Sequence, residues 1–381
     1  MQRSSSLVLT TESRLRAALW GYFAGDALAS PSHWYYGGFP QIKRDYGKIE
    51  DYTQPVYELT GSILNKSNLN GGGRRKATSK DQPQSIIGYV INHGKQDLWS
   101  PSKSIHYHAT LQKGENTLEV QLARVLMKSI VASQGVFNPD HFREAYINFM
   151  MTAGSHNDTY ASTCHRMFFA NLVYGKLPPK DCPDDDGHNV ETIDGLVLPT
   201  IVALAVGARS NGTLAQAADM ASACADVTRK SNVLHQAAGA WGKLVFQSVQ
   251  PSTLDMKSTL QETAASLGFR KPNGNGRDEL TACYLGSAMP ALLDSLAKYN
   301  PNPDSKSSTW HALLANANTG GENVHRGSCL GAVLGSQEGL ERMETVSPQL
   351  MTGLHDFESL RVEIDDFVAA VTTSAKATSL K

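Results

Sequence analysis

Two short motifs that combine an acid with an amide stand about two hundred residues apart in the chain. The first is Gly114-Glu115-Asn116-Thr117 and the second is Gly320-Gly321-Glu322-Asn323-Val324-His325, and each opens an apolar helical pattern. A carboxylate at the start of a helix lies where free backbone N–H groups and the helix dipole favour anions and bound phosphate. Acidic residues are rarely buried without a partner. The motifs therefore indicate an acidic cleft that holds a cation, a polar ligand or a reacting group.

A third carboxylate, Asp26, follows Leu19 and Tyr22 at helical spacing and so points with the apolar face of its helix. Two roles are open for it. Asp26 could cap a neighbouring helix or pair with a buried arginine, or it could line the same cleft as Glu115 and Glu322. We expect Asp26, Glu115 and Glu322 to be the catalytic carboxylates of one shared pocket.

Aromatic residues and histidines accompany these acids. The segment His33-Trp34-Tyr35 could stack on a flat ligand group, or it could simply pack within a loop. His106 and His108 stand two residues apart just before the first motif. On an extended segment they would point the same way and could share a ligand or a metal ion, and two solvated loop histidines are the alternative.

Several further polar residues could either cap helices or bind substrate. Asn116 is a good N-cap for a helix that runs from Thr117. Asn157 or Asp158 could cap the next amphipathic helix or contact a ligand, and Asp194 stands in the same way before a buried helix.

Around the second motif, Gly321 would let the backbone approach a ligand closely. We expect Asn323, His325 and Arg326 to line the opening of the helix and to bind substrate. This helix also carries a stripe without side chains, which predicts close packing against another helix and consists of Gly327, Gly331 and Gly335.

Helical periodicity dominates the chain, and no run of strict alternation indicates a strand. The sequence predicts an all-α protein with a single compact helical domain over residues 13–373 and a mobile tail over 374–381. Residues 30–112 are expected to form a long loop. Helices are expected at 13–29, 117–133, 139–151, 160–174, 193–208, 213–228, 232–248, 254–267, 278–298, 308–317, 326–336 and 356–376.

The composition excludes several classes of protein. The 381 residues are 41% hydrophobic and carry a net charge of −1, so a large core can form and no basic surface for nucleic acid is expected. No apolar stretch approaches the roughly 20 residues that a bilayer requires, and the N-terminus is too weak for a signal peptide. Five scattered cysteines indicate reduced thiols. We expect a cytoplasmic protein that binds neither membrane nor nucleic acid, and the sequence sets no oligomeric state.

The motifs and their order resemble the ADP-ribosylglycohydrolase family, which includes the dinitrogenase reductase-activating glycohydrolase, the eukaryotic ADP-ribosylhydrolases and the jellyfish J1 crystallins. The resemblance covers about residues 13–340. It rests on Gly25-Asp26-Ala27-Leu28, on 114–117 where the family has Thr-Asp-Asp-Thr, on IDGLVLP from residue 193, and on 320–325 where the family has Gly-Gly-Asp-Thr-Asp-Thr. It implies a compact all-α fold, a cleft with two magnesium ions, and cleavage of the bond between ADP-ribose and an amino-acid side chain or a related group.

The sequence departs from the family at the residues that would bind magnesium. Mg²⁺ prefers carboxylate and water oxygens in octahedral geometry. Here Gly114 lacks a ligand side chain, Asn116 replaces an acid, and Val324 is apolar. Glu115 and Glu322 remain as the candidate magnesium ligands. These departures predict a site with one metal ion or none, or a different polar pocket.

We therefore expect a hydrolase that cleaves a ribosyl or ADP-ribosyl glycosidic bond in a small molecule or conjugate. Without a metal ion, the acids and histidines could still supply general acid and base groups, because such a bond breaks through an oxocarbenium-like state that carboxylates stabilise. The alternative is a non-catalytic ligand-binding or structural relative, as in the crystallin branch. A different hydrolase or lyase on the same fold is a third reading.

Overall fold

The computed structural model describes residues 9–71, 85–186, 190–251, 255–273, 282–300 and 308–373. Within these ranges the secondary structure is helical, with isolated bridges and no β-strand, so the expected all-α fold is confirmed. The expected tail 374–381 lies outside the described residues. The helices are α1 (Thr11–Ala29), α2 (Gly38–Tyr46), α3 (Ile86–Tyr89), α4 (Leu118–Ala132), α5 (Pro139–Met151), α6 (Thr163–Val173), α8 (Val197–Ala208), α9 (Leu214–Ala225), α10 (Asn232–Val249), α11 (Met256–Ser266), α12 (Leu285–Tyr299), α13 (Thr309–Ala317), α14 (Val324–Glu338), α15 (Leu340–Val346), α16 (Gln349–Thr352) and α17 (Phe357–Thr373).

Local sequence signals start several of these helices where the periodicity places them. Asn138 accepts hydrogen bonds from the first turn of α5, and Pro139 stands at the first helical position, where its missing N–H costs nothing. Thr213 and Gln216 form a reciprocal capping box at the start of α9. The segment 30–112 is less irregular than expected, because its described part contains the short helices α2 and α3.

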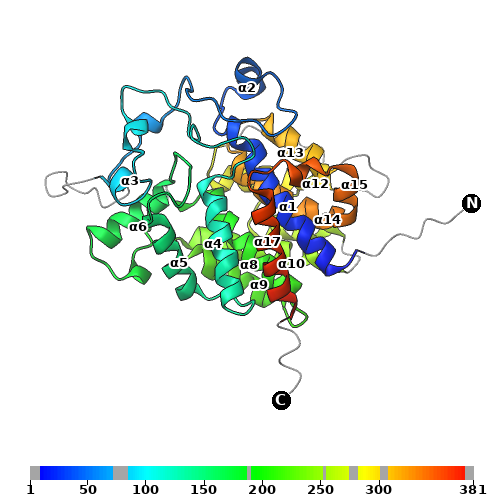
Figure 1. Ribbon diagram of the computed structural model, residues 1–381. Helices are drawn as coiled ribbons and strands as arrows, with labels where there is room; N and C mark the ends of the chain where they lie inside the picture. Colours follow the sequence, from blue (N-terminus) through cyan, green and yellow to red (C-terminus); the bar gives the residue numbers. More distant parts are fainter. Residues whose placement is uncertain are drawn as a thin grey trace, which may run out of the picture.

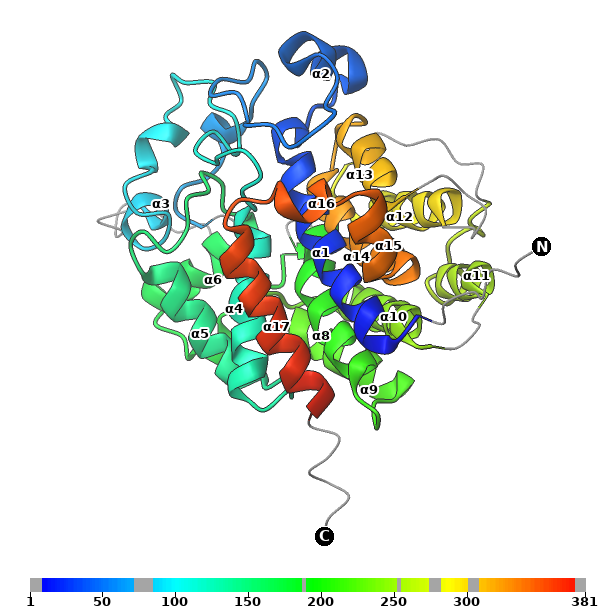
Figure 2. The same ribbon diagram turned by 45° about the vertical axis from the view of Figure 1, so that its right-hand side comes forward.

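Helices α1 and α14 run side by side through the middle of the molecule (Figures 1 and 2). Glycines make this close approach possible. A Cβ atom on Gly331 would lie 2.0 Å from the carbonyl oxygen of Gly21, and one on Gly25 would lie 2.0 Å from that of Gly327. The glycine stripe predicted from the sequence is therefore confirmed as a helix–helix contact, and it fixes the start of α14 next to the end of α1.

We expect Gly331→Ala to destabilise the protein by about 1–3 kcal/mol, because the two backbones must separate to admit the methyl group. The matched control is Gly286→Ala in α12, where a Cβ would meet nothing within 4 Å. That change should stabilise the helix by about 0.5–1 kcal/mol. Urea unfolding of both variants checks the contrast, and equal small effects would show that the α1–α14 contact tolerates side chains.

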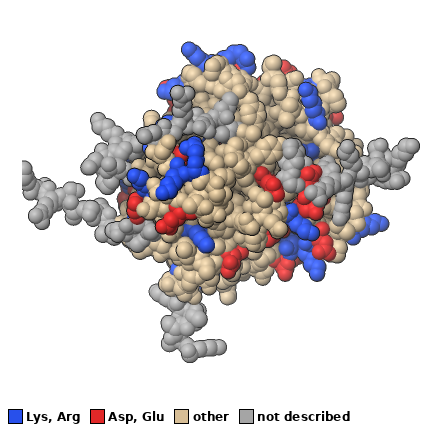
Figure 3. Space-filling model, turned by 180° about the vertical axis from the view of Figure 1, so that it is seen from behind, with Lys and Arg blue, Asp and Glu red and all other residues tan. Residues whose placement is uncertain are grey.

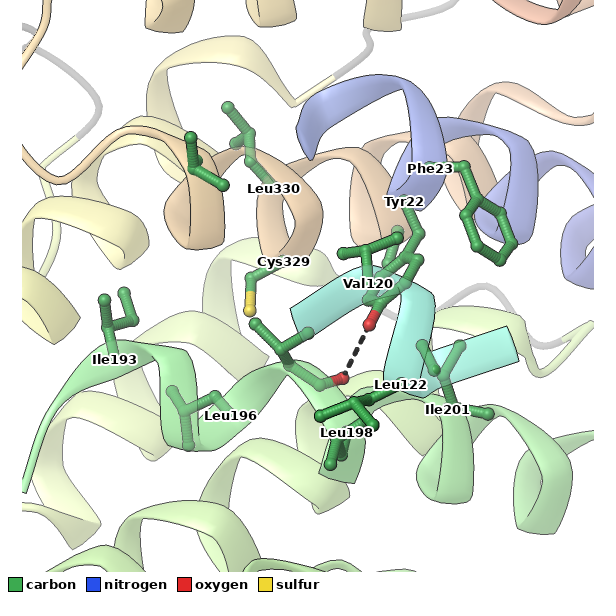
Figure 4. Packing of buried hydrophobic residues seen from close by; sticks show 14 of the residues in the cluster. Tyr22, Phe23, Val120, Leu122, Ile193, Leu196, Leu198, Ile201, Cys329 and Leu330 are labelled. Atoms are coloured by element: carbon green, nitrogen blue, oxygen red, sulfur yellow. Dashed lines mark hydrogen bonds between the residues drawn. The ribbon is translucent and has the colours of Figure 1, made fainter. Parts of the chain in front are cut away.

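The core lies where α1, α4, α8 and α14 meet, and Figure 4 shows this region. Tyr22 of α1 is fully buried, and its hydroxyl donates a hydrogen bond of 3.1 Å to the carbonyl oxygen of Val197 at the start of α8. Cys329 and Leu330 of α14 pack into the same cluster. The five cysteines form no disulfide bond with one another, as the sequence predicted.

The surface carries charges of both signs. Seen from behind, acidic and basic side chains gather in mixed groups beside a broad uncharged area (Figure 3). Among the described residues, no helix combines the length and the apolar character that crossing a bilayer requires.

Candidate active site

Two buried carboxylates from distant segments hold the start of helix α4. Asp26 accepts hydrogen bonds from the Thr117 backbone N–H (2.8 Å), the Thr117 hydroxyl (2.6 Å) and the Asn116 amide (2.9 Å). Asp158 accepts one from the Leu118 backbone N–H (2.8 Å). The first N–H groups of a helix lack partners within the helix and favour negative charge. Asp26 therefore caps a neighbouring helix, which is the simpler of the two roles that the sequence left open.

The capping assignments made from the sequence need correction. The N-cap residue of α4 is Thr117, and the Asn116 side chain instead donates to Asp26 and to the Phe23 carbonyl oxygen. Asn157 or Asp158 was a candidate cap for the helix that follows them, but that helix, α6, begins after Ser162. Both expectations fail because a cap can come from a segment that is distant in the sequence.

Thr117→Val should destabilise the protein by about 1.5–3 kcal/mol, because it removes a hydrogen bond to a buried carboxylate while it keeps the shape of the side chain. Burial raises the pKa of Asp26, whereas its hydrogen-bond donors stabilise the charged carboxylate. The loss of one donor therefore destabilises the charged form. Thr345→Val on the exposed face of α15 is the control and should change stability by less than about 0.5 kcal/mol. Thermal unfolding compares the two, and a small effect at Thr117 would show that Asp26 does not depend on it.

A continuous line of buried side chains starts from Asp158. Asp158 Oδ1 lies 2.8 Å from His108 Nδ1, and His108 Nε2 lies 2.7 Å from His33 Nδ1. His33 Nε2 lies 3.2 Å from Glu322 Oε2. Asp158, His33 and Glu322 are at most 1% exposed. We call the line Asp158–His108–His33–Glu322 the relay. It joins the start of α4, the end of α1 and the start of α14.

Three side chains contact the buried carboxylate of Glu322, and one of them is His33 of the relay. The Trp34 indole N–H donates to its Oε2 at 2.7 Å, and His325 Nδ1 lies 2.5 Å from its Oε1. Burial opposes its ionisation, but His325 and His33 outweigh burial and hold the pKa of Glu322 well below its usual range. In return, Glu322 overcomes the effect of burial on His325 and raises the pKa of His325 to about 9. Glu322 thus keeps its negative charge inside the protein.

His33 and His106 behave differently from His325. Burial lowers the pKa of His33 to about 4 and that of His106 to about 3, so both rings are neutral near pH 7. His106 accepts a hydrogen bond from the His108 backbone N–H and faces the Pro31 carbonyl oxygen, and each bond is 3.0 Å long. The sequence left two roles open for His106 and His108, a shared ligand or two solvated loop histidines. Both rings are buried, and the chain turns here so that each ring has its own partners.

The aromatic segment covers the site. Trp34 stacks on His33, with ring centroids 4.1 Å apart, and meets Tyr107 and Tyr160 edge to face. The backbone of Trp34 has φ = 59°, which is a strained conformation for a bulky residue. Such strained residues cluster at functional sites. The turn before α14 stabilises this conformation, because the Trp34 N–H donates to the Gly321 carbonyl oxygen at 2.8 Å. Of the segment His33-Trp34-Tyr35, the structure thus places His33 and Trp34 against Glu322.

Tyr35 and Gly320 explain the paired glycines. Tyr35 is fully buried, and a Cβ on Gly320 would lie 2.5 Å from its carbonyl oxygen. Tyr35 faces Tyr46 and His106 rather than the relay. It therefore supports the turn, and the structure gives it no contact with the candidate site.

A second buried network lies beside the relay, and the sequence did not predict it. Arg229 donates to both oxygens of Asp194, at 2.9 and 2.7 Å, and lies 4.0 Å from Glu119. Glu119 also contacts His165 Nε2 at 2.8 Å. Asp194, in the short turn Ile193–Leu196, thus forms an ion pair, not a free ligand. No motif or spacing marked Glu119, His165 or Arg229, because each stands within an ordinary helical or loop pattern.

Glu115 lies apart from the cluster. It accepts hydrogen bonds from the Gln112 backbone N–H (2.8 Å) and the Asn157 amide (3.1 Å). Together, Glu115 and Asn157 line a cleft of about 970 Å³ between α4 and α5. The structure therefore does not bring Asp26, Glu115 and Glu322 into one shared pocket. Glu115 and Glu322 likewise do not meet as ligands of one magnesium ion.

The residues near Glu322 do not fit a family-type magnesium site. Asp26 is occupied by three donors, and Val324 is fully buried in the hydrophobic core. The Asn323 amide donates to Ser32, which leaves only its buried Oδ1 without a partner. The Nε of Arg326 donates to the Asn316 side-chain oxygen at 2.8 Å. Few of the carboxylate and hydroxyl oxygens that Mg²⁺ prefers therefore remain among these residues.

Comparisons with known proteins agree with the fold. One solved structure, described as an ADP-ribosylglycohydrolase-related protein complex, is similar with a TM-score of 0.56 and 15% identity. The similarity covers 96% of this chain and 99% of that chain, and at this identity it shows the fold alone. No curated protein matches. A sequence model of the family described as ADP-ribosylglycohydrolase matches residues 8–377, nearly the whole length, and the chain therefore belongs to the ADP-ribosylglycohydrolase family.

Proposed function

We propose that this protein hydrolyses the glycosidic bond of a ribosyl or ADP-ribosyl group in a small molecule or conjugate, and that Glu322 is the central residue of the reaction. One observation carries the proposal. Glu322 is a fully buried carboxylate that keeps its charge, and it stands where two distant helix ends meet. Family membership supports a glycosidic bond as the target.

The reaction needs such a charge. A ribosyl C–N or C–O bond breaks through an oxocarbenium-like state, whose positive charge a nearby carboxylate stabilises. At 4 Å two opposite unit charges attract by about 4 kcal/mol at an effective dielectric constant of 20, but by about 1 kcal/mol in bulk water. The difference favours the buried Glu322 over the half-exposed Glu115 as the stabilising group.

The route to Glu322 runs past aromatic rings. Trp34 covers the carboxylate and is only partly buried, while Tyr36 and Tyr284 are 51% and 39% exposed. Tyr36 lies near enough to Glu322, Cys283 and Tyr284 for their charges to act on it. Flat ring systems of a nucleotide stack well on such side chains. The Trp34 indole has to move aside before a sugar can reach Glu322.

A non-catalytic ligand-binding or structural role is the second candidate, and the closed state of the site favours it. The cavity beside His33, His108 and His325 has a volume of about 10 Å³, which is room for about one water molecule. Against this candidate, a chain without a reaction or ligand gains little from buried charges that cost several kcal/mol each to desolvate.

The two candidates are separated by incubating the purified protein with peptides that carry ADP-ribose on arginine (N-linked) or on serine (O-linked), and by thermal unfolding with and without ADP-ribose. The proposal expects release of ADP-ribose from at least one peptide class. Stabilisation by ADP-ribose without any release would support the binding role. If the protein shows neither release of ADP-ribose nor stabilisation by it, the proposed function is overturned.

A further inference from the structure

The relay contains three links, but its two neutral imidazoles and two carboxylates carry only two hydrogens to form them. Its three links join Asp158 to His108, His108 to His33, and His33 to Glu322. Each link needs one hydrogen, whereas two neutral imidazoles and two carboxylates carry only two. One link of the relay therefore lacks a hydrogen unless the relay takes up a proton, and a metal ion can take the place of that hydrogen. If His108 donates to Asp158 and His33 donates to His108, no hydrogen is left for the link between His33 Nε2 and Glu322 Oε2. This link is also the longest of the three, at 3.2 Å.

The relay also sets the orientation of His33 in the way that metal-binding histidines require. A ligating imidazole usually donates its other N–H to an outer partner, which fixes the tautomer and the ring plane. Here His33 Nδ1 faces His108, and His108 in turn faces the Asp158 carboxylate. The Nε2 lone pair of His33 is thereby directed at Glu322. Two donors that share a tetrahedral ion at about 2.1 Å lie about 3.4 Å apart, close to the observed 3.2 Å.

The surrounding charge favours a cation at this position. Glu322, Asp194, Glu119 and Asp26 all lie close enough to His325 for their charges to act on it. Arg229 and His165 balance only Asp194 and Glu119. Asp26, Asp158 and Glu322 remain, of which Glu322 pairs with His325 and Asp158 lies near Lys95. A divalent ion that replaced the proton of His325 would therefore add one positive charge to a site that still contains the buried Asp26 carboxylate.

The donor atoms determine the kind of ion. His33, Glu322 and His325 each offer one ligand atom, and these atoms all lie within 4.8 Å of one another. Two imidazoles and one carboxylate suit ions such as Zn²⁺ or Fe²⁺, whereas Mg²⁺ prefers oxygen ligands. We propose that His33, Glu322 and His325 bind one divalent transition-metal ion in preference to Mg²⁺. Such an ion would supply a Lewis acid beside Glu322.

Within the described ranges, a second group with suitable donors consists of Glu119, Cys164 and His165. Its histidine has no lone pair to spare, because His165 Nδ1 is 2.7 Å from the Tyr146 hydroxyl and Nε2 is 2.8 Å from Glu119. Arg229 also lies beside Glu119. This group is already neutralised, and it serves below as the internal comparison.

The first test uses the unmodified full-length protein. After removal of metal with a chelator, it is titrated separately with Zn²⁺, Co²⁺ and Mg²⁺, and metal content is measured after dialysis. We expect one equivalent of Zn²⁺ or Co²⁺, bound at least 100-fold more tightly than Mg²⁺, and visible absorption bands of Co²⁺ with nitrogen and oxygen ligands. Absence of stoichiometric Zn²⁺ and Co²⁺ would overturn the proposal. Equal affinity for Mg²⁺ would overturn the preference.

The second test locates the ion. His325→Gln and His33→Gln should each weaken Zn²⁺ binding at least 100-fold, while Cys164→Ser and the exposed His235→Gln should retain it. If Cys164→Ser loses Zn²⁺ while His325→Gln and His33→Gln keep it, the ion binds to the group of Glu119, Cys164 and His165 instead, and the proposal is overturned. Circular dichroism confirms that each variant is folded, and the Co²⁺ spectrum of the unmodified protein identifies the ligand type even if a variant fails to fold.

This inference goes beyond the proposed function, because the two can fail separately. Metal binding without release of ADP-ribose would contradict the hydrolase and leave the metal site intact. Release of ADP-ribose by protein that contains no metal would contradict the metal site and leave the hydrolase intact.

Discussion

Glu322→Gln is expected to lower kcat/KM for ADP-ribosyl hydrolysis at least 100-fold, which corresponds to about 2.7 kcal/mol of transition-state stabilisation. The amide keeps the shape of the side chain and can still accept from the Trp34 indole. It removes the negative charge that faces the positive sugar in the transition state. Initial rates with whichever ADP-ribosyl peptide the unmodified protein cleaves provide the measurement.

Glu115→Gln is the matched control for this substitution. Glu115 is half-exposed on the cleft between α4 and α5, where it contacts Asn157 and the Gln112 backbone. We expect this variant to keep more than about half of the activity, because its charge is screened by water and lies apart from the relay. A strong loss at Glu115 together with a weak loss at Glu322 would contradict our assignment of the catalytic carboxylate.

Arg229→Met is expected to cost about 3–5 kcal/mol of folding free energy. Arg229 is 2% exposed and donates to both oxygens of Asp194. Methionine has a similar length but leaves Asp194 buried and charged without its partner. In the double variant Arg229→Met/Asp194→Asn the loss should be clearly smaller than the sum of the single losses. Urea unfolding measures the cycle, and strict additivity would show that the pair is not coupled.

The same pair predicts how stability depends on pH. Burial would raise the pKa of Asp194, but Arg229 outweighs burial and holds that pKa well below its ordinary value of 3.8. Between these two pKa values the unfolded chain binds the additional proton, so stability falls as pH drops below about 4. Asp194→Asn should reduce this acid-induced loss. An unchanged acid dependence in Asp194→Asn would assign the loss to other carboxylates.

The sequence predicts the frame of the fold better than the details of the site. Helical periodicity placed the long helices, and the spacing of Gly327 and Gly331 predicted the tight contact that brings α14 beside α1. Both depend on local patterns that a single chain displays. The burial of Asp26 and Glu322 followed from the same patterns, since each stands on an apolar helical face or at a helix opening.

The failures arise where tertiary structure decides which side chain points inward. Gly114, at φ = +75°, turns the chain so that Asn116 points to Asp26 while Glu115 remains on the cleft. Consecutive polar residues give no sign of which of them will face inside. Arg229 and Glu119 were missed for a related reason, because a buried charge is recognised by its partner, and that partner is distant in the sequence.

The most direct test of the catalytic assignment is a crystal structure of the protein with ADP-ribose bound. We expect the anomeric carbon of the distal ribose to lie within about 4 Å of the Glu322 carboxylate, because the carboxylate must be in contact with the reacting carbon to stabilise its positive charge. The Trp34 indole should be displaced from its hydrogen bond to Glu322. ADP-ribose with its distal ribose against Glu115 in the cleft between α4 and α5, and the Glu322 cluster unchanged, would contradict the central claim.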